Sequence, residues 1–563
     1  MTVERGVPFR LPDGTTLVSD HYHPPPDPEG RPVPTLLVRQ PYGRTVATTV
    51  VCPHPAWLAR HGYRVVIQDV RGRGDSGGRF DPFRHEADDG AATVEWLARR
   101  PGADGRVGMY GFSYQGLTQL LAAVRQPEGL RCLAPWQTVG DLYHGWFYQQ
   151  GALRLAGTVG WATQMLRHDA RRLRNRRPGE ALEAAWSRLP ALFAHAPYGG
   201  IPELTARGLP GYYRDWVTRR VPGPWWAARD ISTRYDRIRV PGLHVLGWFD
   251  TFLHGSALLY EALRTGAGSP EARDHQYLVA GPWVHIPWGR HAGETDLGPA
   301  AELDTDRLLL RWFNHWLKDT GEFDGEPRIR SFTLGSHTWH TPASLDLAGT
   351  GDGPRQRWHL HSQGRANSSR GDGLLDLAAP SGDEPRDHFV HEPEVPVLSP
   401  GPQAAPGQFN TARAAQFNNV LVYTSAPLPG PVHLLGRPRA SLAAVSRLGE
   451  ADLYVRLGRV LPDGRALHLT HGIARSRWLL GGAGHRPGRV QRWEFPLDPT
   501  DAWLAAGERI RVEVAGSCFP TFDRNPGSGV SPERASPRDW RQNHQQIVHT
   551  ANDPSWVELP TAS

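Results

Sequence analysis

Three amino acids are scarce in this chain of 563 residues, which has three cysteines, three methionines and one lysine, Lys318. The cysteines, Cys52, Cys132 and Cys518, lie too far apart for a metal-binding spacing and do not make an even-numbered disulfide set. This usage indicates a reducing compartment. Because nearly all of the positive charge is arginine, we interpret the net charge of +6 as a compositional bias and expect no nucleic-acid partner.

Long hydrophobic runs are also missing. No stretch approaches the roughly 18 apolar residues of a membrane span, and segment 1–14 lacks the apolar core of a signal peptide. We therefore expect a cytoplasmic, soluble protein with no membrane partner. The length and the hydrophobic fraction of 39% predict about two to four domains with large cores. The oligomeric state stays open, and a homodimer is one option.

Short apolar runs alternate with helical patterns before about residue 135 and again after about residue 240. Such alternation predicts a parallel sheet covered by helices on both faces. The expected strands are 35–40, 63–70, 106–112, 242–248 and 275–281, and the expected helices are 91–100, 116–126, 255–266 and 305–319.

Two further regions have different patterns. Helical periodicity over 151–173 and 180–196, with no good strand nearby, predicts a helical insertion. After about residue 345 helices vanish, and short alternating segments predict a β-sandwich or jelly roll of roughly 200 residues. The predicted domains are an α/β domain in two parts, a helical cap between them and a C-terminal β domain, with the boundaries 1–139, 140–230, 231–345 and 346–563.

Ser113 lies between a predicted strand and a predicted helix, in the stretch GMYGFSYQGLTQ (108–119). A hydrolase nucleophile occupies this kind of sharp turn, where small neighbours let the backbone fold tightly. The usual pattern is Gly-x-Ser-x-Gly, but Gln115 stands in place of the second glycine and Gly116 follows it. A serine here is equally compatible with an ordinary helix N-cap, and spacing alone leaves both interpretations open.

A nucleophilic serine needs a base, and the base needs a carboxylate that orients it. Asp250 follows one predicted strand and His285 follows the next, so the chain order Ser, Asp, His and the placement both fit. Asp250 is also a candidate cap for the following helix. His291 is a rival base, and His244 and His254 flank the acid.

Acyl transfer also needs hydrogen-bond donors for the developing oxyanion. The backbone N–H of Tyr114, directly after the serine, is one candidate. Tyr42, in a loop after an earlier predicted strand, offers a phenolic O–H as the second. The alternative for Tyr42 is a ring packed at the turn formed by Pro41 and Gly43.

Seven stretches together resemble the CocE/NonD (cocaine esterase-like) family of serine hydrolases, which is related to the X-Pro dipeptidyl peptidases and the α-amino-acid ester hydrolases. The match spans nearly the whole chain, and the family's Ser-Tyr-x-Gly pattern accommodates Gln115. The stretches are PYGR (41–44), QDVRGRGDSGG (68–78), EADDGAATVEWLA (86–98), GRVGMYGFSYQGLTQ (105–119), GWFDTFL (247–253), GPWVH (281–285) and RVEVAGSCFPTFDRNPGSG (511–529).

The resemblance implies an α/β hydrolase fold with an inserted helical cap and a C-terminal β jelly-roll domain. By similarity, Ser113 is the nucleophile, His285 the base and Asp250 its orienter, and Tyr42 with the Tyr114 N–H forms the oxyanion hole. The implied activity is hydrolysis of a small-molecule carboxylic ester, or an amide, through an acyl-enzyme with no cofactor. The alternatives are an X-Pro dipeptidyl peptidase, an aminoacyl amidase or α-amino-acid ester hydrolase, an acyl hydrolase of secondary metabolism, and a non-catalytic protein with a lectin-like jelly roll.

Aromatic side chains are candidate walls of the substrate site. In related esterases such residues line the acyl pocket at similar places, here occupied by Trp146, Phe147, Trp161 and Phe252. Aromatic walls favour a flat or bulky acyl group. The other interpretation is that these rings only join the cap to the core.

Four other motifs have ordinary interpretations. The basic run 167–180 is more typical of a solvated helix face than of an anion-binding patch. GRGDSG (72–77) has the spacing of a dinucleotide-binding loop, but no helix follows it at once. HEADD (85–89) we interpret as charges at the start of a helix. His21 and His23 have metal-like spacing, but no third ligand is apparent, so we expect a strand end and no metal site.

Overall fold

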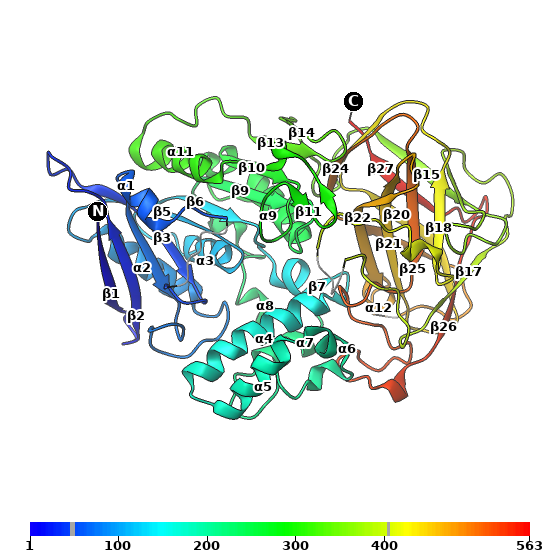
Figure 1. Ribbon diagram of the computed structural model, residues 1–563, viewed down its shortest axis with the longest axis horizontal. Helices are drawn as coiled ribbons and strands as arrows, with labels where there is room; N and C mark the ends of the chain where they lie inside the picture. Colours follow the sequence, from blue (N-terminus) through cyan, green and yellow to red (C-terminus); the bar gives the residue numbers. More distant parts are fainter. Residues whose placement is uncertain (46–50, 402–405, 483, 563) are drawn as a thin grey trace.

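The computed structural model describes residues 1–45, 51–401, 406–482 and 484–562 (Figure 1). A ten-stranded sheet forms its first body, in the order β1-β2-β4-β3-β5-β6-β9-β10-β13-β14. The strands from β4 to β13 in this order are parallel, whereas β1, β2 and β14 pair antiparallel at the two edges. Their bounds are β1 Thr2–Arg10, β2 Thr16–His23, β3 Val33–Gln40, β4 Arg64–Asp69, β5 Ala103–Phe112, β6 Leu130–Trp136, β9 Gly242–Gly247, β10 Gln276–Gly281, β13 Ile329–Thr333 and β14 Thr338–His340.

Helices accompany this sheet, as the alternating pattern predicts. Every residue of β4, β9 and β10 is buried, which a strand needs when both sheet faces are covered. α2 begins at Glu86 rather than at residue 91, because its first turn is acidic and carries no apolar periodicity. The bounds are α1 Pro55–Arg60, α2 Glu86–Ala98, α3 Tyr114–Ala123, α9 Leu253–Gly266, α10 Pro270–Asp274 and α11 Thr305–Lys318.

A group of helices lies below the sheet in Figure 1. They are α4 Leu155–Arg172, α5 Arg176–Trp186, α6 Leu189–Ala194, α7 Tyr212–Thr218 and α8 Pro224–Ala227. The expectation of uninterrupted helix over 180–196 is wrong, since the chain breaks at Ser187 and restarts with Pro190 in the first turn of α6, where no N–H is needed. The expectation of no strand is wrong too, because β7 Tyr148–Gln149 pairs with β8 Ala152–Leu153.

The region after residue 345 is β-rich, as predicted, and forms the body on the right of Figure 1. Eleven of its strands pair in one sheet, in the order β17-β26-β20-β27-β15-β16-β18-β25-β21-β22 with β23 beside β20, and β19 pairs with β24. The bounds are β15 Arg355–His361, β16 Leu374–Asp376, β17 Asp387–His391, β18 Val420–Ser425, β19 Val432–Gly436, β20 Arg439–Ser446, β21 Asp452–Val460, β22 Ala466–Arg475, β23 Gln491–Pro496, β24 Thr500–Leu504, β25 Arg509–Ala515, β26 Asn543–Ile547 and β27 Trp556–Pro560.

Two hydrophobic clusters cross between these regions. One joins helix α3 to the cap helices, through residues such as Leu117 and Trp216. Another joins strand β9 to the C-terminal sheet, through residues such as Leu246 and Leu442. The three regions therefore meet near the carboxyl ends of the central strands. Among the described residues, no helix has the length and apolar character that a membrane span requires.

Candidate active site

Ser113 occupies a strained turn between strand β5 and helix α3. Its φ of 61° and ψ of −126° lie outside the regions that most L-residues adopt. It stands at the N-cap position, but its side chain makes no capping hydrogen bond. Its backbone N–H instead donates to the carbonyl of Trp136 on the neighbouring strand, at 2.9 Å. The capping role therefore does not account for this serine, and the turn is the kind that presents a nucleophile.

Two glycines make this turn sterically possible. A Cβ on Gly116 would lie 2.7 Å from the side chain of Thr138, closer than real Cβ contacts. A Cβ on Gly111, whose φ is +130°, would lie 2.6 Å from the Cβ of Gln115. The missing side chain at position 111 thus makes room for the glutamine that departs from the usual pattern. Gln115 then donates through Nε2 to Gln40 Oε1 at 3.1 Å, which ties the turn to β3.

Asp250 and His285 form a close pair on the loops after β9 and β10. His285 Nδ1 lies 2.9 Å from Asp250 Oδ1, the aspartate side chain is fully buried and the histidine side chain is 22% exposed. Helix α9 begins at Leu253 and receives no side-chain cap, so Asp250 does not serve as its N-cap. A buried carboxylate on Nδ1 fixes the orientation of the imidazole and leaves Nε2 for proton transfer.

The other candidate histidines have different partners. His291 has a side chain that is 64% exposed, and its Nε2 lies 3.8 Å from Asp296. His244 contacts a glutamine oxygen through Nε2 at 2.7 Å, and His254 contacts a different aspartate through Nδ1 at 3.0 Å. Asp250 Oδ1 is therefore engaged by His285 and not by these rivals.

The hydroxyl of Tyr42 lies beside the serine. Burial raises the pKa of Tyr42 to about 12, and the neighbouring side chains of Trp161 and Ser113 partly oppose that rise. The phenol therefore keeps its proton at neutral pH and can donate it in a hydrogen bond. This contact with Ser113 distinguishes Tyr42 from a ring that merely fills a turn.

Tyr114 is fixed by its side chain while its backbone N–H stands next to the serine. Its hydroxyl donates to Glu86 Oε1 at 2.9 Å and accepts the backbone N–H of Phe83 at 3.0 Å. As the first residue of α3, it has an N–H with no acceptor inside the helix. Glu86 is itself bound to Arg39, at 2.8 Å. HEADD thus lies in the first turn of α2, as predicted, but Glu86 also anchors Tyr114, a role that the motif did not indicate.

Three of the four predicted aromatic walls form a chain of rings that reaches the histidine. The ring centroids of Trp146 and Phe252 are 4.3 Å apart, and Phe252 stands perpendicular to His285 at 5.0 Å. Trp161 lies 5.3 Å from Trp146. Phe147 is placed differently, because its nearest ring is that of Trp216 in the cap, at 4.9 Å.

Phe83 is a member of this aromatic cluster that the sequence did not indicate. It has a positive φ of 67°, and its ring stacks on Tyr114 at 4.7 Å and meets the edge of Trp146 at 5.3 Å. It belongs to the loop after GRGDSG, which has no dinucleotide-binding geometry because the next helix begins only at Glu86. No local pattern marks such a phenylalanine, since its role depends on residues distant in the chain.

A cavity of about 400 Å³ opens beside the aspartate–histidine pair. Its walls come from all three regions: Asp250 and His285 from the loops, Arg154 at the start of α4, and His471 and Asp498 from the C-terminal body. The sequence did not indicate Arg154, His471 or Asp498, and the last two lie in the β-rich region, where no site residue was expected. The predicted aromatic walls adjoin His285 but do not line this particular cavity.

The basic run 167–180 behaves as a paired helix surface. Arg167 and Arg171 both bind Glu183 on α5, and Arg176 binds Glu180 at 2.8 Å. Neighbouring carboxylates therefore already engage these guanidinium groups, in line with the predicted solvated face.

A serine on a strained strand-to-helix turn and an Asp–His pair at the carboxyl ends of parallel strands are the features of an α/β-fold serine hydrolase. Residues 13–287 match the X-Pro dipeptidyl-peptidase (S15) family, and residues 321–558 match the X-Pro dipeptidyl-peptidase C-terminal non-catalytic domain. The chain belongs to this family, which confirms the predicted resemblance, and it is a serine hydrolase.

Similar proteins span nearly the whole chain. The cocaine esterase of Rhodococcus sp. is 31% identical over 98% of this chain and 97% of its own length. The crystal structure of an aminopeptidase from a marine sediment Thaumarchaeota archaeon covers 100% of this chain and 97% of its own, with a TM-score of 0.81 and 22% identity. The solved structure of an α-amino acid ester hydrolase covers 100% of this chain and 96% of its own, with a TM-score of 0.77 and 21% identity. The two structures establish the predicted three-part fold.

Proposed function

We propose that the protein hydrolyses carboxylic esters through an acyl-enzyme on Ser113, with His285 as base, Asp250 as its orienter, and Tyr42 and the Tyr114 N–H as the oxyanion hole. The observation that carries this proposal is the strained Ser113 turn, on the same sheet edge as a histidine held at 2.9 Å by a buried aspartate. The contact between the Tyr42 hydroxyl and Ser113 supports the oxyanion role.

In the proposed reaction, Ser113 Oγ attacks the ester carbonyl carbon while His285 Nε2 accepts the serine proton. The carbonyl oxygen becomes an oxyanion that accepts hydrogen bonds from Tyr42 and from the N–H of Tyr114. When the tetrahedral intermediate collapses, the protonated histidine gives its proton to the departing alkoxide, and the alcohol leaves. Water then attacks the acyl-enzyme by the same route and releases the acid, with Asp250 stabilising the imidazolium in both halves.

The acyl group is proposed to lie against Trp146, Trp161 and Phe252. This assignment rests on their contact with one another and with the ring of His285. Flat rings held in place offer a large apolar surface at little cost in conformational entropy, which favours an aromatic or bulky acyl group over acetyl. We propose that Phe147 does not contact the acyl group but packs behind the other rings, because its own ring lies among the cap tryptophans.

Ester substrates are favoured over X-Pro dipeptides and aminoacyl substrates by the carboxylates of the cavity. A free α-ammonium group needs an acidic partner that is not already used. Among the residues that the structure describes, the carboxylates that line the cavity are Asp250 and Asp498, and each is already bound to a histidine. Arg154 in the same wall adds positive charge. The high overall similarity to a protein named cocaine esterase agrees with this choice. A small-molecule substrate and a cytoplasmic location complete the proposal.

The proposal is tested by comparing the wild type with Ser113→Ala over four substrates: a benzoyl ester, an acetyl ester, an aminoacyl amide and an X-Pro amide. The wild type should hydrolyse both esters, the benzoyl ester faster, and Ser113→Ala should lose at least about 10⁴-fold in kcat on each. Ser187→Ala, on the exposed side of the cap, is the matched control and should keep full activity. Retained turnover in Ser113→Ala, or preference for the X-Pro amide, would contradict the proposal.

A further inference from the structure

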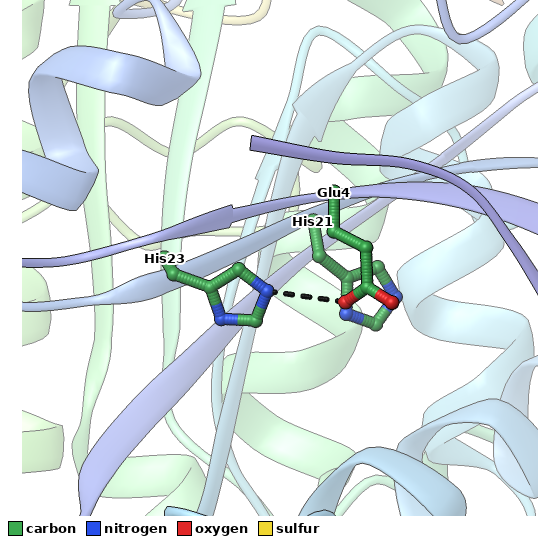
Figure 2. A group of neighbouring side chains, drawn as sticks. All are labelled: Glu4, His21 and His23. Carbon is green, nitrogen blue, oxygen red and sulfur yellow. Dashed lines mark hydrogen bonds and ion pairs between the residues drawn. The ribbon is translucent and has the colours of Figure 1, made fainter. Parts of the chain in front are cut away.

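The N-terminal hairpin brings together three side chains that can bind a metal. Strands β1 and β2 pair so that Glu4 stands directly opposite His21, and His23 points to the same sheet face two residues later. Figure 2 shows the rings of His21 and His23 converging on the Glu4 carboxylate. Glu4 Oε2 and His23 Nε2 are 3.3 Å apart, and one ligand atom of each of the three residues lies within 4.8 Å of the others.

His21 has one ring nitrogen without a partner. Ser19 Oγ donates to the carbonyl of Val7 at 3.3 Å and lies 2.9 Å from His21 Nε2. We assign the proton of the neutral ring to Nε2, which places the lone pair on Nδ1. His21 is 0% exposed, and its Nδ1 has no hydrogen-bond partner among the described residues.

We propose that Glu4, His21 and His23 bind one zinc-class divalent transition-metal ion. Zinc bonds of roughly 2.0–2.1 Å in a tetrahedral site place ligand atoms about 3.3 Å apart, which is the separation found between Glu4 and His23. Metal-binding histidines usually donate their second ring N–H to a neighbouring oxygen, as His21 does to Ser19. Water fills the fourth position, and the exposed Glu4 side chain moves to complete the site.

A second cluster, also of two histidines and one carboxylate, lacks the free ligand atom. His340 Nε2 and His433 Nε2 lie 2.6 and 2.8 Å from the two carboxylate oxygens of Asp501, and Ser331 Oγ also binds that carboxylate. Asp501 is thus fully engaged through hydrogen bonds, which hold its pKa at about 2 despite burial. This cluster links β14 to β19 and β24. Because its carboxylate is already hydrogen-bonded, it serves as an internal comparison for the hairpin site, where His21 Nδ1 has no partner among the described residues.

Metal binding by Glu4, His21 and His23 would affect the stability of the N-terminal hairpin and not the proposed ester hydrolysis. Glu4 lies on β1, the edge strand of the sheet, and the ion would tie this strand to β2. Because the hairpin is at the opposite end of the molecule from the C-terminal body in Figure 1, bound metal should stabilise the edge strand without changing ester hydrolysis.

Calorimetric titration of zinc chloride into the metal-stripped, full-length protein tests this proposal. The wild type should bind one Zn²⁺ per chain, and Glu4→Gln and His23→Ala should each weaken binding at least tenfold. Glu29→Gln and His544→Ala, which change exposed residues outside the cluster, should leave the affinity unchanged. His433→Ala should also keep it, which assigns binding to the hairpin.

Cobalt(II) gives an independent spectroscopic readout. The wild type should develop the visible absorption of low-coordinate cobalt, displaced by one equivalent of zinc, and His23→Ala should not. The circular dichroism and the esterase rate of each variant check that it is folded. Absence of saturable zinc binding in the wild type, or wild-type affinity in the Glu4→Gln/His23→Ala double variant, would overturn the proposal.

Discussion

Two aspartate–histidine pairs have nearly the same geometry, and the aspartate of each borders the same cavity. Asp250 lies 2.9 Å from His285 Nδ1, and Asp498 lies 3.0 Å from His254 Nδ1. The side chain of His285 is 22% exposed, whereas that of His254 is 6% exposed and also contacts Arg437, at 3.2 Å. A carboxylate on Nδ1 therefore does not by itself mark a histidine as a candidate base. Access to the ring is what distinguishes His285, the proposed base, from His254.

The surroundings of the second pair indicate a structural role. Burial lowers the pKa of His254 to about 4, so this imidazole is neutral at physiological pH. Burial raises the pKa of Asp498, but the hydrogen bond from His254 and the nearby cations outweigh it and hold that pKa very low. Gln149 also donates to Asp498 at 3.1 Å. The pair thus connects α9 and the cap region to the C-terminal body.

The largest expected difference comes from the same substitution in each pair. Asp250→Asn should lower kcat on a benzoyl ester by about 10⁴-fold with little change in melting temperature, because the imidazole loses its oriented tautomer. Asp498→Asn should change kcat by less than about tenfold. It should lower stability by roughly 3 kcal/mol, because buried cations lose their counter-charge. Steady-state kinetics and thermal melts of both variants measure this contrast. Similar losses of kcat in the two variants would contradict the assignment of one pair to catalysis and the other to structure.

The next effect concerns Tyr42, the proposed oxyanion donor. Tyr42→Phe should lower kcat by roughly 10²–10³-fold, since it removes one oxyanion donor and keeps the ring. Tyr110→Phe is the matched control, because the buried Tyr110 hydroxyl has no hydrogen-bond partner among the described residues. It should retain full activity. Steady-state kinetics separate the two, and a Tyr42→Phe change confined to KM would assign Tyr42 to binding instead.

Buried and accessible histidines should also differ in how they couple stability to pH. Burial lowers the pKa of His244 to about 4, and its ring binds the side chain of Gln276. In the unfolded chain the His244 imidazole takes up a proton near pH 6.5, whereas in the folded protein it does so only near pH 4. The contribution of neutral His244 to the free energy of unfolding is therefore complete above pH 6.5 and is lost as pH falls toward 4. The loss for His244 should be on the order of 2–3 kcal/mol.

Denaturant unfolding at a series of pH values measures this dependence. His244→Gln should flatten the slope of unfolding free energy between pH 6.5 and 4, whatever its absolute stability. An unchanged slope in that variant would show that His244 is protonated in the folded protein.

The smallest effect is on acyl selectivity. Trp146→Ala should reduce the ratio of kcat/KM for benzoyl over acetyl esters by roughly tenfold, because it removes the ring that packs on Phe252. Phe147→Leu should lower the melting temperature and leave that ratio intact, because its ring lies among cap tryptophans. Proportional loss of both esters in Trp146→Ala would make that ring structural.

The sequence predicted the parts of the site that depend on chain order. Ser113, Asp250 and His285 each follow a predicted buried strand, and parallel strands bring their carboxyl ends to one edge. It did not predict contacts between distant segments, such as Asp498 at the cavity, Phe83 on Tyr114 or Glu4 beside His21. These depend on how separate bodies and strands pack, which periodicity and spacing do not encode. The break at Ser187 was missed because the apolar periodicity continues across it.

The central claim about the active site is that Ser113 is the nucleophile and that the Asp250–His285 pair activates it. Peptide mapping by mass spectrometry after reaction with a fluorophosphonate measures this. We expect one adduct per chain, on the peptide that contains Ser113, formed rapidly in the wild type and in Asp498→Asn but much more slowly in Asp250→Asn. An adduct on another residue, no adduct, or equal labelling rates in the two aspartate variants would contradict the account.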